Sequence, residues 1–100
     1  MEQIQIAPKR NLRRRTHEPD KKKVIILNDD VTTFEFVTQM LIEIFFYEEG
    51  AAIQLTNQVD AEGSAVVGVY PKDIAISKAQ AGMDMARAAN FPLKLITEDA

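Results

Sequence analysis

The sequence predicts an α+β domain in which a three-stranded sheet packs against helices in the order β-α-α-β-α-β. Residues 24–27 form a short, β-branched apolar run that ends at a cluster of turn-forming residues, as a buried strand does. Between residues 34 and 45, apolar side chains recur every three or four positions, which is the period of an amphipathic helix. The 100 residues are enough for one hydrophobic core and no second.

Two helices are predicted after the first strand. The first begins with a capping box, in which the Thr32 hydroxyl and the Glu35 carboxylate bind each other's free backbone N–H groups. Its apolar face consists of Phe34, Val37, Met40, Leu41, Ile44 and Phe45. Glu48 and Glu49 suit the positive N-terminal end of a second helix, which Gly63 ends as a C-terminal cap. The apolar face of that helix consists of Ala52, Ile53, Leu55 and Val59.

The second half of the chain predicts a strand over residues 64–70, a helix over 72–89 and a last strand over 93–97. Gly68 is expected to let another backbone approach the second strand closely. Pro71 suits the first position of the third helix. The inward stripe of this helix is expected to be Ile74, Ala75, Ala79, Met83 and Ala86. So many small side chains predict close packing against the sheet.

Charge divides the chain into a basic extension and an acidic body. Residues 1–23 hold eight basic and three acidic residues, a net +5, whereas residues 24–100 hold four basic and twelve acidic residues, a net −8. Because the extension has no apolar periodicity, we expect a flexible segment over residues 1–21 and a folded body over 22–100. The extension is either a solubilising tail or a segment that binds an acidic partner. The acidic body argues against nucleic acid as the main ligand, since it would repel phosphates.

Residue types also exclude several function classes. The chain has no cysteine, which excludes disulfide scaffolds, thiol nucleophiles and cysteine metal sites. Its single histidine, His17, lies in a polar stretch, so we expect neither a metal site nor a histidine-based triad. Catalytic and phosphate-binding motifs are absent as well, and we therefore expect no enzyme and no cofactor. The apolar run of residues 24–27 is too short to span a membrane, and the N-terminus does not resemble a signal peptide.

Polar groups concentrate in Asn28-Asp29-Asp30, directly after the first predicted strand. Such residues are good turn formers because their side chains accept backbone N–H bonds. Two carboxylates and an amide beside an apolar helix face could also bind a cation, or an ammonium group attached to an apolar side chain. The ligand spacing of a calcium loop is missing. Spacing alone leaves the turn and the binding interpretations both open.

A longer string of residues points to a family. In order and without gaps, the residues that carry the resemblance are Val24-Ile25-Ile26-Leu27-Asn28-Asp29-Asp30, Thr32, Phe34-Glu35-Phe36-Val37, Phe45, Ala52, Val59, Gly63, Gly68-Val69-Tyr70, Asp73, Ala75, Lys78, Ala86-Arg87 and Pro92-Leu93. This string resembles the ClpS family, the adaptor proteins of the N-degron (N-end rule) pathway in bacteria and plastids. The resemblance covers residues 23–100 and implies the fold predicted above, which the C-terminal domain of the ribosomal stalk protein shares.

The resemblance also implies a function and its residues. Family members capture a substrate protein whose first residue is Phe, Tyr, Trp or Leu, and hand it to an AAA+ unfoldase, ClpA or ClpC, of the Clp protease. Asn28, Asp29 and Asp60 would then bind the substrate's α-amino group. The side-chain pocket would be formed by Ile26, Asp30, Thr32, Phe34, Val37, Thr56, Val59 and Leu93. Asp73 and Lys78, both expected to face outward, would dock on the N-terminal domain of the unfoldase. We expect a cytoplasmic monomer with no nucleic-acid or membrane partner.

The sequence departs from the usual family pattern at the expected site. Asp60 stands where the family usually has histidine, and Phe34 and Thr56 stand where it usually has methionine. Val31 replaces a residue that is often aromatic. These departures leave open an adaptor-like domain that binds the unfoldase without capturing substrates. A ribosome- or RNA-associated domain that uses the basic extension is the other alternative.

Overall fold

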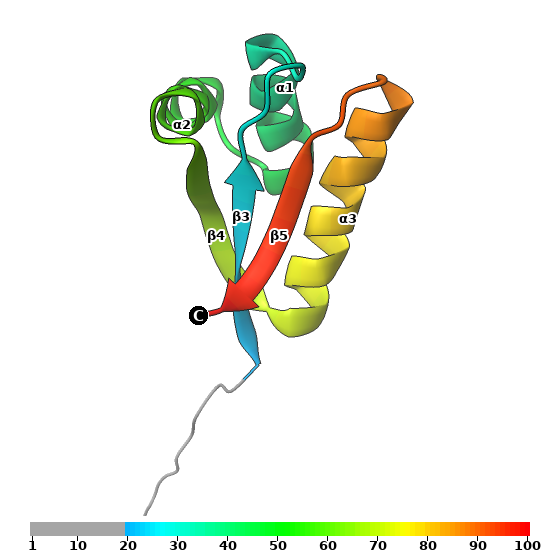
Figure 1. The fold of residues 1–100 in the computed structure, drawn as a ribbon. Coiled ribbons are helices and arrows are strands. Elements are labelled where there is room, and N and C mark those ends of the chain that lie inside the picture. The colour runs from blue at the N-terminus through cyan, green and yellow to red at the C-terminus, as the bar shows by residue number, and fades with distance from the viewer. Residues whose placement is uncertain (1–19) are drawn as a thin grey trace, which may run out of the picture.

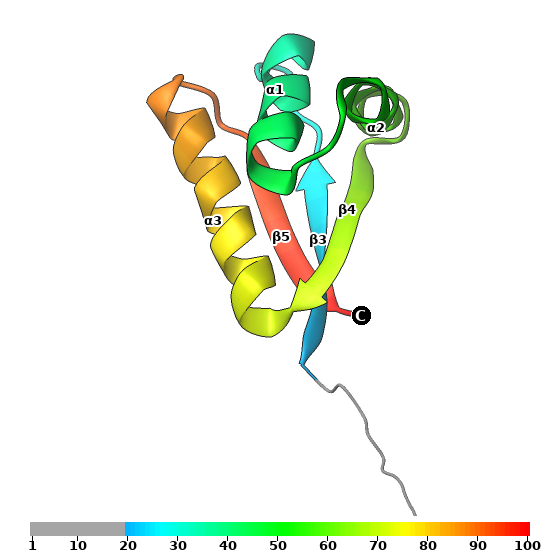
Figure 2. The ribbon, with the colours of Figure 1, turned by 180° about the vertical axis from the view of Figure 1, so that it is seen from behind.

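A computed structural model of the chain describes residues 20–100, so His17 and nearly all of the predicted extension lie outside the described residues. The elements are β3 (Lys21–Leu27), α1 (Phe34–Phe45), α2 (Glu49–Glu62), β4 (Ser64–Pro71), α3 (Lys72–Ala88) and β5 (Lys94–Asp99). The three strands form an antiparallel sheet in the order β4-β3-β5. Helices α1 and α3 cover one face of the sheet, and α2 lies against α1 and the start of β4 (Figures 1 and 2). The predicted α+β class and element order are confirmed.

The core lies between the sheet and the helices. Val24 and Ile26 of the central strand are fully buried, and Leu95 of β5 and Ala65 of β4 pair with Ile26 on its two sides. Burying one side chain of this size contributes roughly 1.5–3 kcal/mol. The remaining core residues are Val37, Met40, Leu41, Phe45, Ala52, Val59, Val67, Ala75, Ala79, Ala86 and Leu93. On the third helix, Gly82 joins the small residues of the stripe because a Cβ there would lie 3.2 Å from both Leu95 Cδ1 and Met40 Sδ. The predicted close packing of this helix is confirmed.

The central strand begins at Lys21, three residues before the predicted apolar run. Lys21 to Lys23 show no apolar pattern, but all three pair with β4, and Lys22 and Lys23 pair with β5 as well. The ammonium group of Lys22 binds the carboxylate of Asp99. At this end of the sheet, the backbone N–H of Ala100 donates to the carbonyl oxygen of Lys21 at 3.1 Å. Pairing with two partners therefore extends the strand beyond what side-chain periodicity predicts.

The role expected of Gly68 is wrong. The register of β3 against β4 shifts between Val24 and Ile25, so Val24 lies opposite Gly68 and Ile25 opposite Val66. At Gly68 the close neighbour is a side chain and not a backbone, because an added Cβ would lie 2.7 Å from the hydroxyl oxygen of Tyr70. Glycine is therefore needed to make room for the Tyr70 ring on the same strand.

The helix ends confirm one predicted cap and correct another. Gly63 closes α2 with φ 88°, and its N–H donates to the Val59 carbonyl oxygen, as predicted. The capping box at Thr32 is wrong, because the N-cap of α1 is Thr33, whose hydroxyl accepts from the Phe36 N–H at 3.1 Å. The Thr32 hydroxyl is turned to Asp29 instead.

Two residues expected on apolar helix faces lie largely in solvent. Ile53 of α2 is 38% exposed and Ile74 of α3 is 46% exposed, whereas their neighbours Ala52 and Ala75 are fully buried. Each isoleucine sits one position off the buried stripe of its helix, which an approximate three- to four-residue period does not resolve. The inward assignment of both residues is wrong.

Candidate functional site

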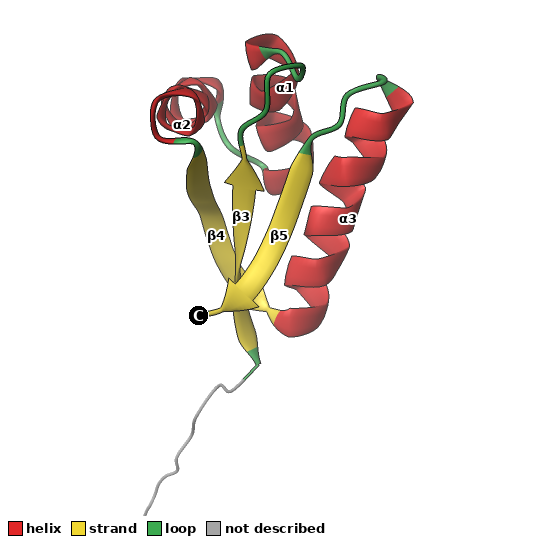
Figure 3. Ribbon diagram, in the orientation of Figure 1, coloured by secondary structure: helices red, strands yellow, loops and turns green. Residues whose placement is uncertain are grey.

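Three segments meet at the end of the sheet where β3 stops. The loops of residues 28–33 and 89–93 lie next to each other at this end (Figure 3). The backbone N–H of Asn28 donates to the carbonyl oxygen of Gly63 at 2.9 Å, which ties the end of β3 to the turn between α2 and β4. In the second loop, Arg87 Nη1 donates to the carbonyl oxygens of Phe91 and Leu93 at 3.0 and 2.8 Å. One bond between backbone groups and two bonds from the Arg87 side chain thus hold these loops in place.

Asp29 organises the first loop. Its Oδ1 accepts the backbone N–H groups of Val31 and Thr32 at 2.8 and 2.7 Å, and its Oδ2 accepts the Thr32 hydroxyl at 2.7 Å. Burial raises the pKa of Asp29, but these hydrogen bonds and the positive charge of Arg87 outweigh it, and the pKa lies below its ordinary value. Asp29 is therefore a charged turn former, and its two oxygens can still accept at least one further donor.

A hollow of about 280 Å³ opens beside this carboxylate. It is lined by Leu27, Asn28, Asp29, Pro92 and Lys94. Leu27 and Lys94 lie opposite each other in the pairing of β3 with β5. Because successive side chains of a strand alternate between the two faces, Leu27 lies on the face away from the buried Ile26. The hollow combines an apolar wall with an amide, a carboxylate and an ammonium group.

Most residues predicted to line a side-chain pocket are core residues in this structure. Ile26, Val37, Thr56, Val59 and Leu93 have exposed fractions between 0 and 6%. These five side chains pack in the core, and their contact with a ligand stays a prediction. Only the remaining predicted pocket residues reach the surface, with Asp30 exposed and Thr32 and Phe34 half-buried.

Thr56 brings a hydroxyl into this otherwise apolar region. It is 2% exposed and donates to the carbonyl oxygen of Ala52 at 2.7 Å. The Thr38 hydroxyl lies 2.9 Å away and is left to donate to Thr56. Thr38 was missed from the sequence, although it stands one turn after Phe34 on the same helix. The pair is fully hydrogen-bonded, so the polar substitution does not leave an unsatisfied group in the core.

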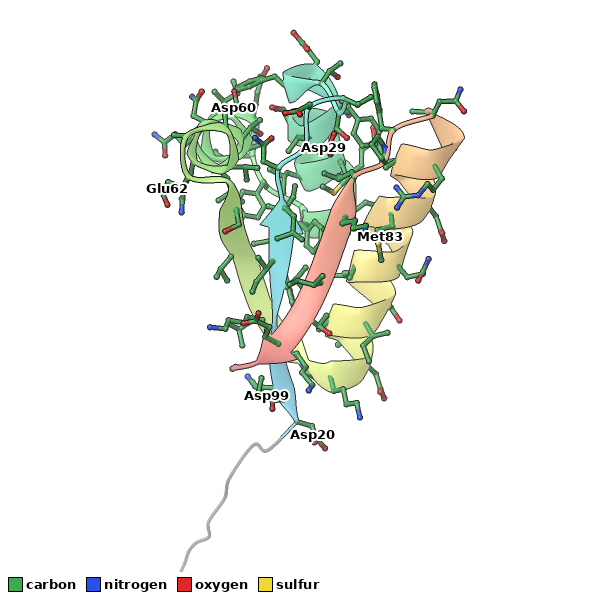
Figure 4. All side chains as sticks on the ribbon, in the orientation of Figure 1. Asp20, Asp29, Asp60, Glu62, Met83 and Asp99 are labelled. Carbon is green, nitrogen blue, oxygen red and sulfur yellow. The ribbon has the colours of Figure 1, made fainter. Side chains whose placement is uncertain are left out.

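Asp60 lies at the same end of the molecule as Asp29. Figure 4 places Asp60 on α2 beside this end, whereas Asp20 and Asp99 lie at the opposite end. Asp60 is exposed and stands three residues before Gly63, which holds the Asn28 N–H. The structure therefore brings the residues predicted to bind an α-amino group to one end of the fold, where the cations Lys94 and Arg87 also lie near Asp29.

The two residues predicted to dock a partner differ in their surroundings. Asp73 is exposed in the first turn of α3, as expected. Lys78 is half-buried, and its Nζ donates to the carbonyl oxygen of Ile44 at 2.8 Å. The expectation that both face freely outward is wrong for Lys78, because its ammonium group satisfies one of the last carbonyls of α1.

Two absences bear on the chemistry of residues 20–100. Within this range, no group of three or more histidine or acidic residues is placed to hold a metal ion. No helix in the same range has the length and apolar character that crossing a bilayer requires.

Known proteins share both the sequence and the fold. The family described as "ATP-dependent Clp protease adaptor protein ClpS" matches residues 17–96. The ClpS adapter protein of Nautilia profundicola is 47% identical over 81 residues, which are 81% of this chain and 84% of that protein. The protein of the same name from Campylobacter jejuni is 44% identical over 82 residues, 82% of this chain and 85% of the relative.

A solved structure gives the same result in three dimensions. Agrobacterium tumefaciens ClpS2, solved bound to L-phenylalaninamide, superposes with a TM-score of 0.79 at 40% sequence identity. The match covers 82% of this chain and 99% of that one. With the matching element order and the Asn28-Asp29-Asp30 loop at the end of the central strand, these similarities show that the chain belongs to the ClpS family of ATP-dependent Clp protease adaptor proteins.

Proposed function

We propose that this chain captures proteins whose free N-terminal residue has a large hydrophobic side chain and delivers them to a ClpA- or ClpC-type AAA+ unfoldase. It acts as a cytoplasmic binding module and catalyses no reaction. The observation that carries the proposal is the charged Asp29 carboxylate, held beside Asn28 at the rim of a hollow with room for another donor. The phenylalaninamide bound by the Agrobacterium relative supports it, because that ligand has a free α-amino group and an aromatic side chain.

The chemistry of an N-terminal residue fits these groups. An α-ammonium has a reference pKa near ~8 and is mostly charged at neutral pH, with three protons to donate. Asn28, Asp29 and Asp60 supply an amide oxygen and two carboxylates. A neutral histidine at position 60 would accept through one ring nitrogen only, whereas Asp60 offers a charged acceptor. Burial of an aromatic or leucine side chain adds roughly 1.5–3 kcal/mol.

Selectivity for a free N-terminus follows from the acceptor groups that other ligands would leave without a hydrogen-bond donor. An internal or acetylated residue has no ammonium group, so it would leave the acceptors at the rim without a partner. The pocket residues proposed from the family are buried here, and the side chain is expected to enter beside Phe34 and Thr32, the two that reach the surface with Asp30. The extension over residues 1–21 is proposed to act on the unfoldase and not on the substrate.

Peptide binding tests the proposal. We expect a Phe- or Leu-initiated peptide to bind and the same peptide with an acetylated amine not to bind. Asp60→Ala should weaken binding by ~1.5–3 kcal/mol, about ten- to a hundredfold, the range for a hydrogen bond to a charged group. Equal binding of free and acetylated peptides would refute capture through the amine. If no peptide binds but the unfoldase does, the chain docks without capturing substrates, which the buried pocket residues favour as the second candidate.

A further inference from the structure

Phe46 stands out at the end of α1 because neither its burial nor its backbone favours an aromatic residue. Its side chain is 80% exposed, more than any other exposed large hydrophobic residue of residues 20–100. It caps α1 in the left-handed conformation, with φ 61° and ψ 31°. For a residue with a Cβ this conformation costs roughly 1–2 kcal/mol, and glycine or asparagine usually occupies it. Neither burial nor backbone conformation therefore explains an aromatic residue at position 46.

Lys78 is held against this ring. Its Nζ lies 4.6 Å from the centroid of the Phe46 ring and also faces the rings of Tyr70 and Phe45 at 5.6 and 5.7 Å. One of its three N–H groups is used by Ile44. A lysine side chain that already contacts one carbonyl oxygen and three rings loses little further conformational freedom when it binds a partner. Its remaining N–H groups can donate to a carboxylate.

The neighbouring surface of α3 extends this contact. Ile74 lies one helical turn before Lys78, on the same side of the helix, and is 46% exposed. Asp73 is exposed next to it. We call Phe46, Asp73, Ile74 and Lys78 the Phe46 patch. It combines two exposed apolar side chains with one cation and one anion, a mixture that protein-binding surfaces also have.

We propose that Phe46 is the apolar anchor through which this chain docks on its unfoldase, with Lys78 beside it to pair with a carboxylate of the partner. The inference rests on the proposed function for the identity of the partner, and it adds the residue that supplies most of the contact. The partner surface that fits is an apolar recess next to an acidic side chain. Aromatic residues at the centre of such contacts dominate binding, while their polar neighbours exclude water.

The position of the patch allows docking and substrate capture at once. The Asn28–Asp29 loop precedes α1 and Phe46 follows it, and a helix of 12 residues separates them by about 18 Å. A substrate held at one end of α1 thus leaves the other end free for the unfoldase. Contact with the unfoldase would explain why the chain has a phenylalanine at a position where the left-handed backbone makes a residue with a Cβ unfavourable.

The experiment compares binding with stability in the full chain. Phe46→Gly and Phe46→Asn both suit the left-handed backbone, so we expect thermal midpoints equal to or above that of the wild type. Affinity for the intact ClpA- or ClpC-type unfoldase encoded in the same genome should fall at least tenfold in both variants. Phe46→Tyr should keep the affinity, because the ring remains. Val66→Ser removes another exposed apolar side chain, 47% exposed on the sheet face away from the helices, and should leave docking unchanged.

Each outcome has a clear meaning. Wild-type affinity in Phe46→Gly and Phe46→Asn overturns the anchor, and so does an equal loss in Val66→Ser. Binding of a Phe-initiated peptide serves as the independent readout and should be the same in all four variants. If the unfoldase binds the wild type but no peptide does, substrate capture fails while the anchor stands. If the wild type binds no unfoldase, the anchor falls together with the delivery function.

Discussion

Replacing Asp29 by asparagine separates the loop-forming role that the structure shows from the binding role proposed for this side chain. Asparagine can accept the N–H groups of Val31 and Thr32 through its amide oxygen, and its NH₂ group can donate to the Thr32 hydroxyl in place of the present bond. The loop should therefore keep its shape in Asp29→Asn. What is lost is the negative charge that would face the α-ammonium of a substrate.

The magnitudes follow from the hydrogen bonds. A bond to a charged group contributes about 1.5–3 kcal/mol and a neutral one about 0.5–1.5 kcal/mol, so Asp29→Asn should weaken peptide binding by about 1 kcal/mol, or five- to tenfold. Asp29→Ala loses all three bonds of the loop. Because water can replace part of these bonds, the loss of stability should resemble that caused by replacing an N-cap side chain with alanine, about 1–2 kcal/mol. For a domain of this size each kcal/mol lowers the thermal midpoint by roughly 4–8 °C.

The effect of pH has a definite sign. The pKa of Asp29 is depressed in the folded chain, so its charge stabilises the fold at a pH above the unfolded value, near ~3.9. That contribution is lost as the pH falls through the folded pKa. The difference in unfolding free energy between the wild type and Asp29→Asn should therefore shrink on acidification below about pH 4.

Urea titrations at pH 7 and pH 3, with anisotropy of a labelled Phe-initiated peptide, measure both roles. Asp20→Asn is the control for the loss of one carboxylate, because Asp20 is exposed at the opposite end of the fold. The reasoning is refuted if Asp29→Asn binds the peptide as tightly as the wild type while Asp29→Ala loses only stability. Asp29 would then serve the turn alone.

Substitutions at three further positions and one deletion test other parts of the structure. Gly63→Ala should lose about 1–2 kcal/mol of stability in urea titration, because φ is 88° there; an unchanged midpoint would contradict the cap. Lys78→Glu should destabilise the fold by about 1 kcal/mol, since a carboxylate would face the Ile44 carbonyl, whereas Lys78→Arg should not. Arg87→Gln should lower peptide affinity through the loop it fixes, and wild-type affinity would show that the loop holds without it. Deleting residues 1–20 should leave peptide binding unchanged but slow degradation by the protease; equal rates at limiting adaptor would refute a role in delivery.

Sequence patterns predicted the elements well where side chains alone decide them. The period of α1 and the glycine at the end of α2 are local signals, and both are confirmed. The N-cap was assigned one residue early because Glu35, three residues after Thr32, completes the sequence pattern of a capping box, whereas Phe36 follows Thr33 at that spacing. Only the fold shows that the Thr32 hydroxyl donates to Asp29, so that Thr33 caps the N-terminus of α1.

The site was less predictable because its contacts join segments far apart in the chain. The sequence pointed to Asn28 and Asp29, but the hollow beside them also needs Lys94, which reaches it only through strand pairing. Lys78 looked like a surface charge, and its bond to Ile44 spans 34 positions. Periodicity gives no information on such contacts, since it reports only which face of an element a residue occupies.

The pairing of β3 with β5 has a mechanical consequence for a protein that works beside an unfoldase. The strands are antiparallel neighbours, and β3 begins where β5 ends, with Lys22 opposite Asp99. A force that separates the two chain ends would therefore break this pair one rung at a time, starting from the bond between Lys22 and Asp99, and each rung contributes a net 0.5–1.5 kcal/mol only. The Asn28 end of β3 lies about 23 Å away, at the other end of a strand of 7 residues. A force that pulls this end against the C-terminal end of β5 acts along the strands and would load many rungs at once. Traction through the termini would thus open the sheet far more easily than traction through a captured substrate.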